Sequence, residues 1–180
     1  MPSLAPAVFL DRDGTLMEDV VYCRNPAEVR IFPGVIEALR RLKAAGFMNV
    51  IITNQSGIGR GTIALSEYEA VHARLLELLG GKLIDAAYMC PDRNDAPGPR
   101  RKPNPGMVLD AARDLGLDLA RSWFIGDKAI DVQCGVNAGT RSVLVLTGQG
   151  SAADAAGATF VAKDLEEAAE FILKHSDASR

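Results

Sequence analysis

The sequence predicts an α/β fold built on a doubly wound parallel sheet. Short apolar runs, often β-branched, alternate with amphipathic helical patterns along the chain. Several of these runs are apolar on both faces, which is typical of strands that helices cover on both sides. Such strand–helix alternation implies right-handed crossovers and a parallel sheet, in which ligands bind at the carboxyl ends of the strands.

The first half of the chain contains three predicted strands and two predicted helices. The first helix has Pro33 near its start and Gly46 at its end, as is usual for helix termini. The second begins with Ser66 and Glu69, which have the spacing of a capping box. The strands are expected at 7–10, 49–53 and 85–90, and the helices at 33–46 and 66–81.

The second half continues the alternation with three more strands and three helices. Before them, residues 91–103 are dense in proline, glycine and charge, and are expected to form a loop. The spacing leaves no room for a large cap domain, so we expect a single domain over residues 1–180. The strands are expected at 122–126, 142–146 and 158–162, and the helices at 104–116, 129–139 and 164–175.

Composition excludes several classes of function. The net charge of −3 gives no basic footprint for nucleic acid or anionic lipid. No apolar run approaches the roughly 20 residues of a membrane span, and the N-terminus lacks the features of a signal peptide. Three widely separated cysteines fit a reducing compartment better than a disulfide framework. We therefore expect a cytoplasmic protein, and a monomer, that binds neither nucleic acid nor membranes.

Four polar segments lie at or near the ends of predicted strands. Each alone has an ordinary structural explanation, such as a turn, a solvated loop or a helix N-cap. If the strands are parallel, however, all four segments meet at one edge of the sheet. The segments are DRDGT (11–15), TNQSGIGRG (53–61), RKP (101–103) and GDK (126–128) with Asp131 shortly after it.

Phosphoryl transfer is the chemistry that this combination favours. Asp11, Asp13 and Asp127 offer the hard oxygen ligands that Mg²⁺ prefers. One aspartate can attack phosphorus, and a second can protonate the leaving oxygen and later deprotonate water. Thr53, with neighbouring amides, can hold the phosphoryl oxygens, and Lys102 supplies the positive charge that the transferring group needs.

This ordered set resembles the haloacid dehalogenase-like phosphohydrolases. Their signature is DxDGT, a hydroxyl residue after the second strand, a lysine, and GDxxxD, all of which are present here. The resemblance implies a Rossmann-like core, with Asp11 as nucleophile and Asp13 as general acid/base. It implies that Thr53 and Lys102 hold the phosphoryl group.

The resemblance also implies a magnesium site. The Asp11 carboxylate, the Asp13 main-chain carbonyl and Asp127 would hold Mg²⁺. Asp131 would support this site through water or Lys128. A catalytically silent binding module is an alternative from another class, but such proteins usually lack a nucleophile or metal ligand that this chain retains.

Within that family, residues 7–150 are most similar to the branch that acts on heptose bisphosphates, related to histidinol phosphatases. The similarity implies removal of the 7-phosphate of D-glycero-D-manno-heptose 1,7-bisphosphate through an aspartyl-phosphate, towards lipopolysaccharide. The alternative is a histidinol-phosphate phosphatase or another small sugar-phosphate phosphomonoesterase, although Ser56 stands where the histidinol branch usually has aspartate. The implied substrate contacts are Asp19, Val20, Val21, Tyr22, Thr53, Asn54, Gln55, Ser56, Arg101, Lys102 and Lys128.

One departure from the family pattern concerns zinc. Related enzymes usually carry a zinc loop, whereas this chain has only Cys90 and Asp92, with no cysteine before Arg101. A structural zinc site normally takes four Cys or His ligands, so zinc is not expected. We expect proline and hydrogen bonds to shape residues 91–101, and Arg101 and Lys128 to be free for a distal anionic group of the substrate.

Overall fold

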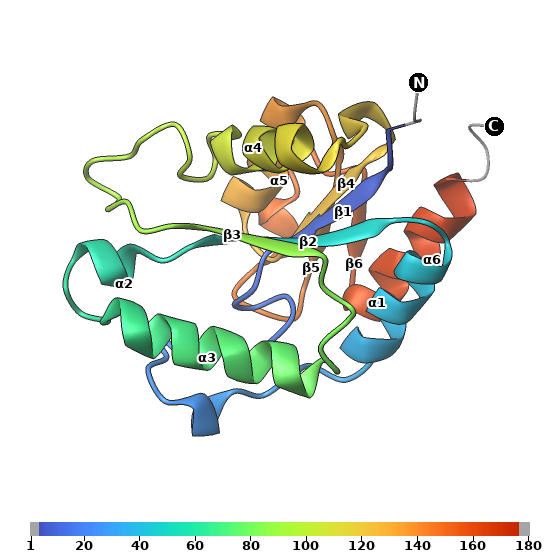
Figure 1. Ribbon diagram of the computed structural model, residues 1–180. Coiled ribbons are helices and arrows are strands. Elements are labelled where there is room, and N and C mark those ends of the chain that lie inside the picture. The colour runs from blue at the N-terminus through green and yellow to red at the C-terminus, as the bar shows by residue number, and fades with distance from the viewer. Residues whose placement is uncertain (1–3, 177–180) are drawn as a thin grey trace.

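The computed structural model describes residues 4–176 and is organised around a six-stranded parallel sheet (Figure 1). The strand order is β3-β2-β1-β4-β5-β6, and every neighbouring pair is parallel. The predicted α/β class is therefore confirmed. Because the connections reverse direction between β1 and β4, the carboxyl ends of these two strands border the crevice where such sheets bind ligands. The strands are Ala7–Leu10, Met48–Asn54, Ala86–Cys90, Trp123–Gly126, Arg141–Val145 and Phe160–Ala162.

Helices cover both faces of the sheet (Figure 1). Helices α1 (Val35–Ala44), α3 (Leu65–Leu78) and α6 (Leu165–Ser176) contribute to one apolar cluster, and α4 (Gly106–Leu115) and α5 (Ala129–Ala138) contribute to the other. The remaining helical segments are short. They are α2 (Ser56–Gly59) and the 3-10 helices Pro26–Glu28, Leu119–Arg121 and Ala152–Asp154.

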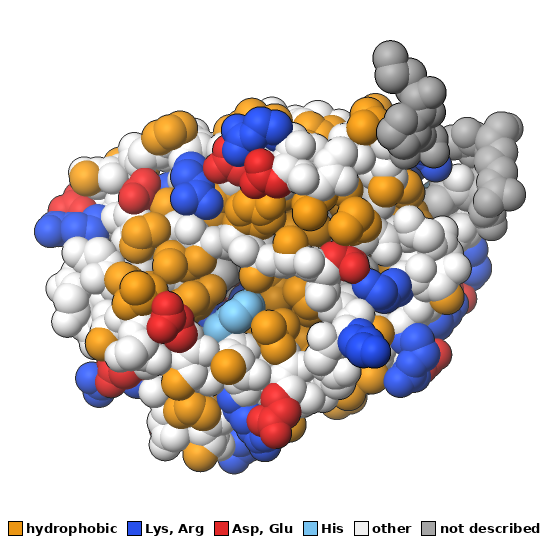
Figure 2. Space-filling view, in the orientation of Figure 1, with side chains coloured by type: hydrophobic (Ala, Val, Ile, Leu, Met, Phe, Trp, Pro, Cys, Tyr) orange, Lys and Arg blue, Asp and Glu red, His pale blue; other side chains and the backbone are white. Residues whose placement is uncertain are grey.

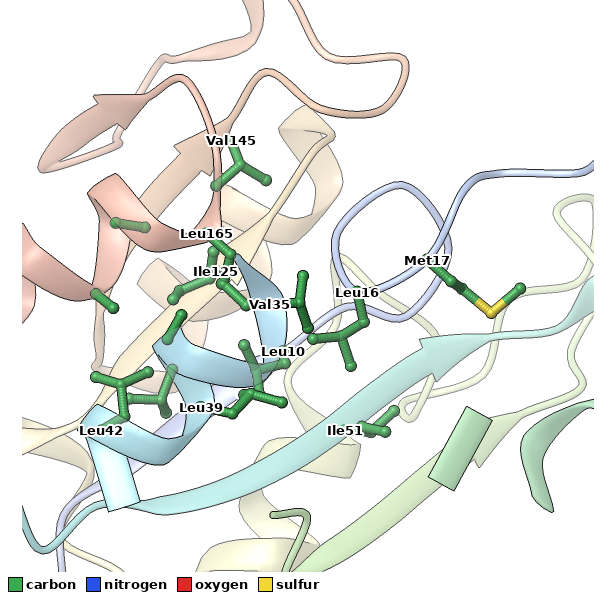
Figure 3. Close-up of a cluster of buried hydrophobic side chains, with 14 of the residues drawn as sticks. Leu10, Leu16, Met17, Val35, Leu39, Leu42, Ile51, Ile125, Val145 and Leu165 are labelled. Carbon is green, nitrogen blue, oxygen red and sulfur yellow. The ribbon is translucent and has the colours of Figure 1, made fainter. Parts of the chain in front are cut away.

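Strand β1 shows how the two clusters are built. Val8 and Leu10 belong to the cluster beneath α1 and α6, whereas Ala7 and Phe9 belong to the opposite one. This is the alternation of a strand that is buried on both faces. Leu16, just after the first motif, is fully buried in the same cluster as Leu10 (Figure 3). The turn between them is thus anchored in the core at both ends.

The start of α3 corrects the prediction. The helix begins at Leu65, and the Glu67 carboxylate accepts a hydrogen bond from the Ala64 amide at 2.8 Å. The predicted capping box of Ser66 and Glu69 is therefore wrong. Glu67 occupies the third helical position, from which a carboxylate reaches the residue before the helix, whereas Ser66 already lies in the first turn.

The carboxyl edge of the sheet is not covered by a large cap. Between Gly14 and Pro33, the described chain forms only the 3-10 helix Pro26–Glu28 as regular helix. None of the helices within residues 4–176 combines the length and apolar character needed to cross a bilayer. Figure 2 shows acidic and basic side chains interspersed among apolar ones on one face of the molecule.

Candidate active site

Three buried carboxylates gather where β1 and β4 end. Asp11 continues β1, and its amide donates to the carbonyl of Ile125 at 2.9 Å. Asp127 follows β4, and Asp131 lies in the first turn of α5. Oxygen atoms of the three carboxylates all lie within 4.8 Å of one another, and the exposed fractions are 6% for Asp11 and 0% for the other two.

The chain packs tightly around Asp127. Its Oδ2 accepts a hydrogen bond from the Gln149 amide at 2.8 Å, whereas its buried Oδ1 has no partner among the described residues. Gly14 has a φ of +91°, and a Cβ there would lie 2.4 Å from Asp127 Oδ2. A Cβ at Gly148 would lie 2.1 Å from the same atom. Both positions therefore require glycine for the backbone to approach this carboxylate.

The donor set fits a hard divalent cation. Burial, and then the charge of Asp11, raise the pKa of both Asp127 and Asp131. Ionisation of all three carboxylates together is therefore unfavourable without a cation. A Mg²⁺ ion would offset this repulsion, and the unpartnered Asp127 Oδ1 is an oxygen ligand of the kind Mg²⁺ prefers. Asp11 and Asp127 could hold the ion with their carboxylates, as predicted.

Lys102 lies beside the carboxylates and is 3% exposed. Its Nζ lies 2.7 Å from Asp11 Oδ1 and 2.7 Å from Asp131 Oδ1, and it donates to the Ile52 carbonyl at 2.9 Å. Burial alone lowers the pKa of Lys102, but the two carboxylates outweigh it and raise the pKa. The ammonium group is therefore charged and fixed next to the predicted nucleophile.

Asn54 fixes the backbone of Lys102. The side-chain Nδ2 of Asn54 donates to the Lys102 carbonyl at 3.2 Å, and its Oδ1 accepts from the Lys102 backbone amide at 3.1 Å. At the other end of the loop, the Gln55 amide donates to the Cys90 carbonyl at 2.7 Å. The end of β2 thus holds both ends of the loop that carries the third motif.

Asp13, the predicted acid/base, is held by two side chains. Arg12 donates to both of its oxygens, from Nε to Oδ2 and from Nη2 to Oδ1, each at 3.0 Å. Gln55 Nε2 donates to Asp13 Oδ2 and to Thr53 Oγ1, both at 2.9 Å. Burial raises the pKa of Asp13, and the charge of Arg12 opposes this rise. Gln55 therefore links the acid/base to the hydroxyl predicted to hold phosphate.

A cavity of about 390 Å³ opens over these groups. Most of the predicted site residues line it: Asp11, Asp13, Asp19, Val20, Val21, Tyr22, Asn54, Gln55, Ser56, Lys102 and Lys128. Thr53 and Asp127 do not appear in the lining, since they are 1% and 0% exposed. Arg101 is also outside the lining, for a different reason.

Arg101 faces its own loop. Its guanidinium group donates to the Asp92 carbonyl at 2.6 Å and to Asn94 Oδ1 at 2.5 Å, and Asn94 lines the cavity. The Gly98 amide donates to Asp92 Oδ2 at 3.0 Å. The expectation that Arg101 is free for substrate therefore does not match its geometry, because its fork is already occupied. Hydrogen bonds shape this loop, as the sequence indicated.

Lys128 stands at the mouth of the cavity. Its Nζ lies 3.1 Å from Asp19 Oδ2, and Gln149 Nε2 donates to the same oxygen at 2.8 Å. Nearby, Arg60 donates to the Tyr22 hydroxyl at 3.0 Å, which joins the segment after the first motif to the segment after β2. The expectation that Lys128 is free is therefore wrong, because Lys128 is paired with Asp19. Its side chain is still 36% exposed.

Asp131 has a role that the sequence only partly indicated. Its Oδ2 accepts from the Lys128 amide at 3.1 Å, so the expected link to Lys128 is present through the backbone. The ion pair of Oδ1 with Lys102 was not anticipated.

Several residues in or beside the cavity have no role that the sequence motifs predicted. Arg12 is embedded in the first motif, and its position between two aspartates was the only signal for it. Gln149 and Gly148 lie in the loop after β5, outside every predicted motif. Asn94 lies in a loop whose conformation the sequence does not specify.

Comparison with known proteins shows the family to which the chain is similar. Residues 99–168 match the HAD-hydrolase-like family. A Thermosynechococcus vestitus protein named D-glycero-D-manno-heptose-1,7-bisphosphate 7-phosphatase is 41% identical over 189 residues, covering 94% of this chain and 96% of that protein. An Escherichia coli K12 protein, D-glycero-beta-D-manno-heptose-1,7-bisphosphate 7-phosphatase, is 39% identical over 160 residues and covers 83% of each chain.

Two solved structures are similar to this chain in fold and in sequence. D,D-heptose 1.7-bisphosphate phosphatase from B. bronchiseptica, complexed with magnesium and phosphate, is similar with a TM-score of 0.86. It is 36% identical, covering 94% of this chain and 98% of that chain. A putative HAD-like phosphatase from Mesorhizobium loti has a TM-score of 0.83 and 37% identity, covering 99% and 90% of the respective chains.

Proposed function

Because the chain belongs to the heptose-1,7-bisphosphate 7-phosphatase family of HAD-like hydrolases, we propose that it removes the 7-phosphate of D-glycero-D-manno-heptose 1,7-bisphosphate. It is a Mg²⁺-dependent phosphoric monoester hydrolase. The observation that carries the proposal is the position of Asp11. This carboxylate lines the cavity, ion-pairs with Lys102 and lies two residues from an acid/base.

The first half-reaction transfers the phosphoryl group to the protein. An Asp11 carboxylate oxygen attacks phosphorus while the bond from phosphorus to the sugar oxygen breaks. The proton carried by Asp13 goes to that leaving oxygen, which departs as the sugar hydroxyl. Lys102, held by Asp131 and the Ile52 carbonyl, places a fixed positive charge beside the group being transferred.

The second half-reaction regenerates the enzyme. Asp13, now ionised, takes a proton from a water molecule whose oxygen attacks phosphorus, and the bond from phosphorus to the Asp11 oxygen breaks. Inorganic phosphate is released. The carboxylates of Asp11 and Asp127 and the main-chain carbonyl of Asp13 would hold Mg²⁺, which when bound would offset the negative charge of the transferring group.

Thr53 and Asn54 complete the phosphate side of the site in this proposal. The Thr53 hydroxyl accepts a hydrogen bond from Gln55, so its own proton is available for a phosphoryl oxygen. The remaining cavity residues, from Asp19 to Tyr22 and Gln55 to Ser56, would contact the sugar.

The distal phosphate would meet Lys128, the partly exposed cation of the cavity wall. Arg101 would act on it less directly, because its guanidinium group holds Asn94 in the wall. The distal phosphate would then either displace Asp19 from Lys128 or bind Lys128 together with Asp19.

Two further features belong to the proposal. The chain is proposed to act as a monomer, as expected from its sequence. Three buried cysteines without disulfides support a reducing, cytoplasmic location. A role in making activated heptose for lipopolysaccharide would follow from the substrate.

A substrate panel tests the proposal. With Mg²⁺ present, kcat/KM is compared for heptose 1,7-bisphosphate, heptose 7-phosphate, histidinol phosphate and simple sugar phosphates. We expect the bisphosphate to be preferred over the monophosphate. Equal values for the two heptose phosphates would leave a general phosphomonoesterase, and preference for histidinol phosphate would establish the alternative branch.

Two variants locate the source of the preference. Lys128→Ala and Arg101→Ala should each reduce kcat/KM for the bisphosphate more than for small phosphomonoesters. Arg24→Ala serves as a control, because this exposed arginine does not line the 390 Å³ cavity. A preference that survives both variants would exclude these cations as the distal phosphate site.

A further inference from the structure

Arg12 is a buried cation that the reaction described above does not use. It is 2% exposed, although arginine is rarely buried unless it is paired. The side-chain partner of its guanidinium group is Asp13, reached through two parallel hydrogen bonds of 3.0 Å. On another side, Arg12 Cζ lies 5.1 Å from the centre of the Tyr68 ring on α3.

We propose that Arg12 is a positioning residue that holds the Asp13 carboxyl group where it serves the leaving oxygen and the attacking water. The Tyr68 ring is the platform that fixes the guanidinium plane. The inference rests on the proposed phosphatase mechanism, since it assigns a partner to the acid/base of that reaction.

The local backbone makes the pairing of neighbouring residues possible. In an extended strand, consecutive side chains point to opposite faces and cannot meet. Here the chain turns directly after Asp11, and the amides of Leu16 and Met17 donate to the Arg12 carbonyl at 2.9 and 3.2 Å. This turn brings the Arg12 and Asp13 side chains together.

The geometry distinguishes positioning from simple charge compensation. A planar guanidinium fork bound through two hydrogen bonds fixes both the place and the rotation of a carboxylate, which a point charge does not do. Gln55 adds a third donor to Asp13 at 2.9 Å, from the end of β2. Both oxygens of Asp13 are thus held, from two separate segments of the chain.

The contact with Tyr68 extends the arrangement to α3. Arginine stacks favourably on aromatic faces, and a buried ring restricts the guanidinium plane. Tyr68 is 7% exposed and stacks in turn on His72, with ring centres 5.7 Å apart. Helix α3 therefore supports the acid/base through Arg12, although it contributes no residue to the cavity lining.

Leaving-group dependence tests the proposal. General acid–base catalysis contributes about 10² to 10⁴ in rate when the leaving group needs a proton. An alkyl phosphate has such a leaving group, whereas 2,4-dinitrophenyl phosphate has an acidic one that departs with little help. We expect Arg12→Lys to lower kcat/KM about 100-fold for the alkyl phosphate and less than about 5-fold for the aryl phosphate.

Asp13→Asn is the reference variant, and should show the same pattern. Adding Arg12→Lys to Asp13→Asn should have little further effect, because the two residues act through one group. Arg74→Lys, on the exposed side of α3, should leave both substrates unaffected. Equal losses of Arg12→Lys on both substrates, full activity of that variant, or independent effects in the double variant would overturn the proposal.

Tyr68 provides a second test that keeps Arg12 intact, in case its variants fail to fold. Tyr68→Leu should show the same dependence on leaving group, and Tyr68→Phe, which keeps the ring, should largely restore the alkyl phosphate rate. If the ratio of kcat/KM between the alkyl and the aryl phosphate were unchanged in Tyr68→Leu, Tyr68 would have no role in fixing the guanidinium plane. The alkyl substrate is whichever one wild type hydrolyses best, so failure of the heptose assignment would appear in the substrate panel and not here.

Discussion

The ammonium group of Lys102 lies 2.7 Å from the carboxylate of Asp131, and both side chains are buried. Asp131 and Asp11 thus both attract the same ammonium group. Without this second carboxylate, Asp11 would be the one carboxylate among the described residues beside the ammonium group, which also donates to the Ile52 carbonyl. The lysine that assists the phosphoryl group is therefore held by a residue that need not touch substrate.

Asp131→Asn should lower kcat/KM about 10- to 100-fold, the usual cost of losing a supporting residue beside a metal site. The asparagine can still accept from the Lys128 amide, so the start of α5 should be preserved. Steady-state kinetics with a thermal unfolding curve for each protein would measure this. Asp118→Asn, which also removes a helix-capping carboxylate, is a control away from the site. Unchanged kinetics would show that Lys102 does not need Asp131.

Asp11→Asn should abolish turnover, because an amide cannot attack phosphorus or offer the same charge to Mg²⁺. Asp13→Asn should reduce turnover of the preferred sugar phosphate by about 10² to 10⁴, the range of general acid–base catalysis. Circular dichroism would verify that both variants fold. If Asp11→Asn kept wild-type activity, the aspartyl-phosphate mechanism would be excluded.

Metal content provides a separate prediction. Activity should disappear in EDTA and return with added Mg²⁺, because Asp127 Oδ1 is buried and has no hydrogen-bond partner within residues 4–176. The purified protein should carry no stoichiometric zinc. Within residues 4–176, the one group of three or more potential metal ligands is Asp11, Asp127 and Asp131, at the magnesium position. Elemental analysis that finds about one tightly bound zinc per chain would contradict this ligand count.

Asp127 should also make stability depend on pH when metal is absent. Burial and the charge of Asp11 raise the pKa of Asp127 from 3.8 to about 6. Because folding raises this pKa, ionisation of Asp127 destabilises the folded state, and the penalty grows as pH rises from the unfolded to the folded pKa. Above about pH 6 the penalty is fully present.

Asp127→Asn should therefore raise the Tm of the EDTA-treated protein near neutral pH, by about 2 to 4 °C for each kcal/mol relieved. Near pH 4 the difference from wild type should shrink, because Asp127 is then largely protonated. Added Mg²⁺ should raise the Tm of wild type but not of the variant. A lower Tm for the variant near neutral pH would show that Asp127 stabilises the metal-free fold.

The fold was largely predictable because each strand is an apolar run that ends at a polar segment. Parallel pairing then brought Asp11, Lys102 and Asp127 to one edge of the sheet. The start of α3 was not predictable in the same way. Two acidic residues, Glu67 and Glu69, could each serve as a cap, and only the path of the preceding chain selects Glu67.

Side-chain partners at the site were harder to predict than its members. Arg12 and Asp13 are adjacent in sequence, so their pairing depends on a turn that motif spacing does not specify. Arg101 was expected to be free, but the loop has enough backbone carbonyl and amide acceptors to occupy its fork. Gln149 reaches the site from a loop without any motif, through its backbone amide.

The attachment of the loop between Cys90 and Lys102 to the end of β2 has a consequence for the position of Lys102. Asn54 pairs with the Lys102 backbone as a neighbouring peptide would, and Gln55 holds the Cys90 carbonyl. Insertions, deletions or new metal ligands between these two anchors would change the wall of the cavity without moving the ammonium group. The position of Lys102 therefore depends on Asn54 and β2 rather than on the length of the loop that precedes it.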